Sequence, residues 1–96
     1  MSRFITEKET ESYLEYSSRL LTMPNGSSCS VSAMKLTWDY YDFILSRPSY
    51  SESIVMDFAR RLSEDENIDF DLAFDNVVGY IGNRLREILG VEFRSS

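Results

Sequence analysis

The 96-residue chain contains no histidine and only one cysteine, and these absences exclude several kinds of chemistry. Without histidine, the side chain that most often transfers protons near neutral pH is missing, and Ser–His or Cys–His catalytic pairs cannot form. Zinc sites are built mainly from histidine and cysteine, so a zinc site is not expected either. The lone Cys29 cannot form an internal disulfide, which fits a reducing compartment. We therefore expect a cytoplasmic protein that is not an enzyme and has no cofactor.

Long apolar runs are also absent. No stretch approaches the roughly 20 residues of a membrane span, and the N-terminal MSRFITEKETE lacks the apolar core of a signal peptide. Hydrophobic residues nevertheless make up 43% of the chain, which is enough for a core. The length is typical of one domain. We expect a single domain over residues 1–96 and no membrane association.

The net charge of −6 comes from one part of the chain. Residues 49–76 hold eight acids and two bases, whereas the remaining acids and bases balance. Within this part, the run SEDENIDFDLAFDN over residues 63–76 has no base and six acids, which are Glu64, Asp65, Glu66, Asp69, Asp71 and Asp75. A negative field repels nucleic acid and attracts basic protein surfaces.

A β-hairpin is expected near the middle of the first half. Pro24 and Asn25 suit the centre of a type I turn, and Gly26 suits the left-handed position that follows. The flanking strands are expected at about 18–23 and 28–36. In the second strand three serines alternate with apolar residues, which gives one polar face with Ser28, Ser30 and Ser32.

Four helices are expected, at about 7–16, 38–46, 50–64 and 69–89. Residues with good capping chemistry precede them: Thr6 and Ser49 each begin a capping box, and Thr37 and Asp69 are caps. The last helix has the clearest apolar stripe: Phe70, Ala73, Phe74, Val77, Val78, Ile81, Leu85, Ile88 and Leu89. Together these elements predict an α+β fold in which a small antiparallel hairpin is packed by three to four helices.

The acidic run partly matches a calcium loop, because Asp65, Asn67, Asp69 and Asp71 are spaced like its first ligands. However, Phe70 occupies the position that needs glycine, and Asn76 the position of the closing glutamate. We therefore predict a helix–helix junction and no metal site.

Two glycines lie inside the last predicted helix, where each costs about 1 kcal/mol relative to alanine. Gly79 and Gly82 therefore indicate close approach, either by a partner or by another part of the chain. We favour packing within the chain.

The segment SCSVSAMKLTWDYYDFIL followed by SYSESIVMDFARRL resembles the strand–helix–helix order of ribbon-helix-helix regulators over residues 28–63. The resemblance implies a dimer whose paired strands enter the DNA major groove. Ser28, Ser30 and Ser32 would then face bases, and amides near Ser49–Ser51 would meet phosphate. DNA binding is not favoured, because the segment has few cations with which to neutralise phosphates.

The acids divide into two groups. Those that begin the last helix offset its dipole, whereas Glu64, Asp65 and Glu66 end a helix, where acids are unfavourable. Aromatics offer a second clue, since Trp38, Tyr40, Tyr41 and Phe43 are too many for one face of a short helix. Trp and Tyr are favoured at interfaces, and a core that wraps this helix on two sides is the alternative explanation.

The leading hypothesis is therefore a non-catalytic acidic protein that engages a basic surface of a partner protein. The chain is similar in kind to small phage-encoded inhibitors of restriction and CRISPR systems, which implies inhibition of a nucleic-acid-handling complex. Alternatives are a dimeric ribbon-helix-helix-like regulator and a small structural subunit, and a homodimer stays open. The expected contact residues are Glu64, Asp65, Glu66, Asp69, Asp71, Asp75, Trp38 and Tyr40.

Overall fold

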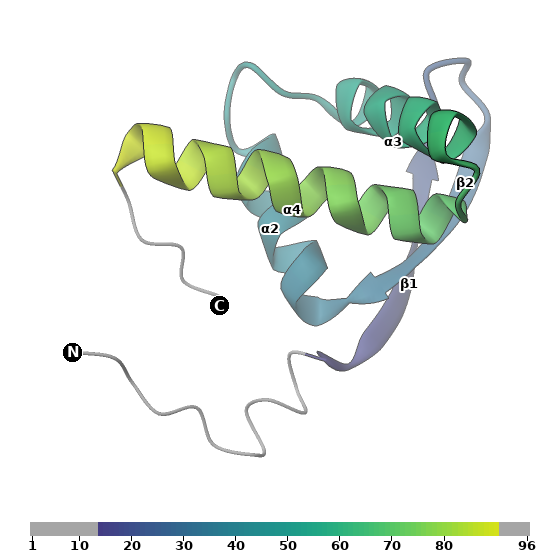
Figure 1. Ribbon diagram of the computed structural model, residues 1–96, viewed down its shortest axis with the longest axis horizontal. Coiled ribbons are helices and arrows are strands. Elements are labelled where there is room, and N and C mark those ends of the chain that lie inside the picture. Colours follow the sequence, from purple (N-terminus) through teal and green to yellow (C-terminus); the bar gives the residue numbers. More distant parts are fainter. Residues whose placement is uncertain (1–13, 91–96) are drawn as a thin grey trace.

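A computed structural model describes residues 14–90 of the chain (Figure 1). In chain order its elements are β1 (Tyr16–Thr22), β2 (Ser28–Met34), α2 (Lys35–Leu45), α3 (Glu52–Glu66) and α4 (Phe70–Leu89). This confirms an α+β arrangement of an antiparallel hairpin and three helices. The helix predicted over 7–16 lies outside the described residues except at its end, where Tyr16 begins β1 instead.

The hairpin is one-sided. Its register runs from Tyr16 opposite Met34 to Thr22 opposite Ser28. The turn is as predicted, because Gly26 has a φ of 89° and its N–H donates to the Met23 carbonyl at 2.9 Å. One face packs inward through Leu21, Val31 and Ala33. The other face is open to solvent: Tyr16 is 66% exposed and Leu20 is 72% exposed.

Two helix starts differ from the prediction. Helix α2 follows β2 directly, so Thr37 lies inside the helix rather than at its cap, and its hydroxyl donates to the Asp75 carboxylate. Lys35 is the first residue of α2, and its N–H donates to the Glu15 carbonyl at 2.9 Å. The hydrogen bonding between the two strands thus extends to the first residue of the helix. Helix α3 is capped by Ser51 rather than Ser49, with the Ser51 hydroxyl accepting from the Ile54 N–H.

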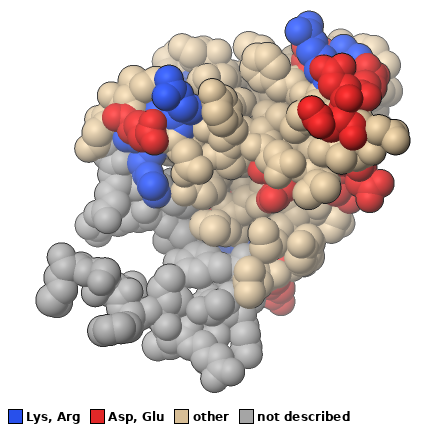
Figure 2. Space-filling model, in the orientation of Figure 1, with Lys and Arg blue, Asp and Glu red and all other residues tan. Residues whose placement is uncertain are grey.

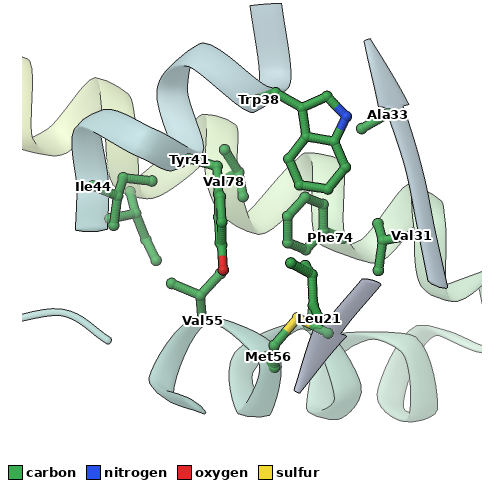
Figure 3. Packing of buried hydrophobic residues seen from close by; sticks show 12 residues of the cluster. Leu21, Val31, Ala33, Trp38, Tyr41, Ile44, Val55, Met56, Phe74 and Val78 are labelled. Atoms are coloured by element: carbon green, nitrogen blue, oxygen red, sulfur yellow. The ribbon is translucent and has the colours of Figure 1, made fainter. Parts of the chain in front are cut away.

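The core lies where α4 crosses α2 and α3 (Figures 1 and 3). Trp38, Tyr41 and Phe74 form an aromatic cluster whose ring centroids lie 5.3–5.6 Å apart. Trp38 is only 2% exposed, and its indole N–H donates to the Ser17 carbonyl at 3.0 Å. The expected role of Trp38 as a partner contact is therefore wrong, because this side chain presents almost no surface.

Arg19 closes the core on its hairpin side. Its guanidinium carbon lies 4.6 Å from the centroid of the Trp38 ring, and it forms an ion pair with Asp42 at 2.8 Å. The hydrogen bond to Asp42 raises the pKa of Arg19. Trp38 is thus covered by a cation as well as by apolar neighbours.

Gly82 packs closely within the chain, as predicted. A Cβ atom at Gly82 would lie 2.5 Å from Cδ1 of Tyr40, whereas a Cβ at Gly79 would meet nothing within 4 Å among the described residues. Gly82 therefore lets α2 approach α4, and Gly79 does not.

Within residues 14–90, every helix is too short or too polar to span a lipid bilayer.

Candidate interaction surface

Two of the six acids in the run 63–76 hold the fold together. From the first turns of α4, Asp71 accepts the backbone N–H of Ser32 in β2 at 3.2 Å. One turn later, Asp75 accepts the hydroxyl of Thr37 in α2. Their carboxylates bond to the hairpin and to α2, so both have an intramolecular role, and the partner contact predicted for them stays a prediction.

Glu52 has a similar role that sequence reasoning missed. Its carboxylate accepts the Tyr41 hydroxyl at 2.6 Å and the Thr22 N–H at 2.9 Å, so one side chain joins α3 to α2 and β1. Burial raises the pKa of Tyr41, and the hydrogen bond to Glu52 raises it further. Glu52 is the acidic residue of the capping box predicted to begin at Ser49, and no local pattern indicates these distant partners.

The other four acids, Glu64, Asp65, Glu66 and Asp69, form what we call the acidic end. All four are exposed where α3 ends and α4 begins, and Figure 2 shows acidic atoms gathered there. Glu64 is paired with Arg60 at 3.2 Å. Asp65, Glu66 and Asp69 form no ion pair with any residue of the described range 14–90. Among residues 14–90, three of the four acids of this surface therefore have no paired base.

Tyr40 lies apart from the acidic end. Its ring packs against Gly82, and its hydroxyl lies 3.4 Å from Asn83 Oδ1 and 3.5 Å from Arg86 in the second half of α4. The acidic end is at the opposite, N-terminal end of α4. The predicted contact residues therefore fall into three groups. Trp38 lies in the core, the acidic end is exposed, and the remaining three (Tyr40, Asp71 and Asp75) contact other elements of the chain.

An apolar groove of about 600 Å³ runs between α3 and α4. Its apolar lining comes from α3 (Phe58, Leu62), from α4 (Val77, Tyr80, Ile81) and from Tyr50 in the preceding loop. Phe58 is 44% exposed and Tyr80 69% exposed. Apolar spacing gave no sign that Phe58 and Leu62 face a groove, because it groups them with Val55, which fills the core side of α3 together with Met56 and Ala59.

The junction between α3 and α4 is a short turn, as predicted. Asn67 adopts a left-handed conformation with a φ of 53°, and α4 begins at Phe70. Phe70 thus starts a helix where a calcium loop would continue.

The serine face of β2 is partly open. Ser28 and Ser30 are exposed, whereas Ser32 is half-buried beside Asp71. β2 pairs with β1 of the same chain, whereas in the ribbon-helix-helix family this strand pairs with that of a second copy.

No protein-family model, curated protein or solved structure matches this chain. The surface is therefore interpreted from its own chemistry.

Proposed function

We propose that the protein is a non-catalytic binding protein whose acidic end engages a basic surface on a partner protein. The observation that supports this most directly is the exposure of Asp65, Glu66 and Asp69 without an ion pair inside the described residues. Asp65 and Glu66 stand in the last turn of α3. The helix dipole disfavours acids at that end, so stability of the helix does not account for them.

The chemistry of this surface favours a partner that handles nucleic acid. Such proteins collect Lys and Arg to neutralise phosphates, and these side chains are equally suited to carboxylates. The acidic end presents four carboxylates where two packed helices meet. To a basic groove on a partner, they offer the same kind of negative charge as the phosphates of a short stretch of nucleic acid. Binding there displaces nucleic acid, so inhibition is the proposed outcome.

The experiment is affinity capture from a lysate of the source cells with the wild-type chain and two charge-matched variants. The test variant is Asp65→Lys with Glu66→Lys. The control is Glu15→Lys with Glu87→Lys, which makes the same charge change at exposed sites away from the acidic end. We expect the test variant to capture at least about tenfold less of the basic nucleic-acid-handling proteins than the wild-type chain does, and the control to capture the same amount as the wild-type chain.

Captured contacts should also weaken as salt rises, because exposed charge pairs are screened. Equal capture of the same proteins by the wild-type chain and the test variant would overturn the proposal.

A further inference from the structure

The groove between α3 and α4 leaves large apolar side chains in contact with water. Tyr80 and Phe58 are exposed, whereas Leu62 and Val77, which also line the groove, are partly buried. In Figure 2 a mostly uncharged surface lies between two areas that each hold both acidic and basic atoms. Grouped exposed aromatics of this kind typically mark a contact with another molecule.

Opposite charges stand at the two ends of the groove. Asp65 follows Phe58 by seven residues, so it lies about two turns, or roughly 10 Å, further along the same side of α3. Arg84 follows Tyr80 by four residues, so it lies about one turn, or roughly 6 Å, further along the same side of α4. Because the two helices run antiparallel (Figure 1), the carboxylate and the guanidinium mark opposite ends.

Both charged groups are available for a contact. Asp65 is exposed and has no ion pair within residues 14–90. Arg84 has an exposed side chain, and its only ion pair among those residues is a long one, 3.7 Å, to Glu87. Neither group is needed to hold the described helices together.

We propose that this groove binds a second copy of the chain across a two-fold axis. The axis passes through the apolar centre of the groove, so that Tyr80 and Phe58 of the two copies pack together. Asp65 of each copy then lies against Arg84 of the other. A two-fold contact requires a surface that complements itself, and an apolar centre with opposite charges at its two ends meets that requirement.

The charge pattern favours a second copy over an unrelated helix. An unrelated partner would need a base and an acid at the two ends of an apolar stripe. A second copy already has both, because it carries the same Asp65 and Arg84. The net charge of −6 per copy opposes association at low salt. The dimer is therefore best measured near physiological ionic strength, where charges beyond about 8 Å are screened.

This inference shares Asp65 with the proposed partner contact, so the two contacts compete for that carboxylate. The dimer is measured on the pure chain, so its absence leaves the lysate experiment unaffected.

The first experiment is sedimentation of the full chain at concentrations up to about 1 mM. We expect a species with twice the 11.2 kDa mass of one copy. Tyr80→Ser should raise the dissociation constant at least about thirtyfold, as for an aromatic at the centre of an interface. Tyr16→Ser is the matched control, since Tyr16 is 66% exposed on the outer face of the hairpin, and it should leave the constant unchanged.

A wild-type chain that stays monomeric over this range overturns the proposal. So does a dimer that is weakened by Tyr16→Ser but not by Tyr80→Ser, because that result points to pairing through the hairpin. Both tyrosines are mostly exposed, so each variant is expected to stay folded, which circular dichroism checks.

The second experiment tests the two-fold arrangement by exchanging charges. Asp65→Arg alone and Arg84→Asp alone each place like charges at both contacts, and each should weaken the dimer about tenfold. A mixture of the two variants makes both contacts complementary again and should form a heterodimer as tight as the wild-type dimer. Failure of the mixture to recover overturns the arrangement.

Discussion

Glu52, Asp71 and Asp75 lie on the same pair of helices as the four acids of the acidic end, but within residues 14–90 only the first group bonds to other elements. Their carboxylates accept hydrogen bonds from the hairpin and from α2. The acids of the acidic end stand where α3 ends and α4 begins, and all four are exposed. The same chemical group thus acts as a structural link or as exposed charge according to what packs beside it.

The largest effect is expected when the inner group is disrupted. Glu52→Ala removes the acceptor of both the Tyr41 hydroxyl and the Thr22 N–H, and it leaves the buried hydroxyl without a partner. We expect the free energy of unfolding to fall by about 2–4 kcal/mol. Urea denaturation measures it, with Glu64→Ala at the acidic end as the control. A loss below about 1 kcal/mol would show that Glu52 does not link these elements.

A pH titration sharpens the same contrast. The folded state raises the pKa of Tyr41, so Tyr41 keeps its proton when folded and loses it near pH 10 when unfolded. Its contribution to stability is therefore complete below pH 10 and falls above it, by up to about 1.4 kcal/mol per pH unit. Unfolding measured from pH 9 to 11 should show this fall in the wild-type chain and a weaker fall in Tyr41→Phe. Identical slopes would contradict it.

The smallest effect on stability is expected at the acidic end. Asp65→Lys with Glu66→Lys replaces acids by bases in the last turn of α3, where the helix dipole favours positive charge. The free energy of unfolding should stay unchanged or rise by up to about 1 kcal/mol. Thermal unfolding of the purified variant measures it, and a clear loss of stability would place these two acids in the structural group.

Much of the fold follows from local patterns. The stripe from Phe70 to Leu85 predicts α4, and the turn at Gly26 predicts the hairpin, because both depend on periodicity and backbone geometry. Helix starts were less predictable. Thr37 and Ser49 are good caps by residue type, but Thr37 is drawn into the helix beside Asp75, and Ser51 takes the cap of α3.

The candidate site was predictable in composition but not in arrangement. Glu52 lies 30 residues from Thr22, and Asp71 lies 39 residues from Ser32, so no local spacing indicates that these acids have partners. Helical spacing likewise selects Phe58 and Val55 together, although Val55 is fully buried and Phe58 lines the groove. Only the packing of α4 against α3 separates the two.

The two hydrogen bonds between helix carboxylates and the hairpin backbone also protect the two edges of the sheet. Thr22 and Ser32 belong to different strands, and each gives its N–H to a helix carboxylate rather than to the neighbouring strand. A strand from another molecule that tried to extend the sheet on either side would have to displace a carboxylate first. Exposed strand edges are common starting points for aggregation, so Glu52 and Asp71 also protect a two-stranded sheet that has no other strands beside it in the described residues.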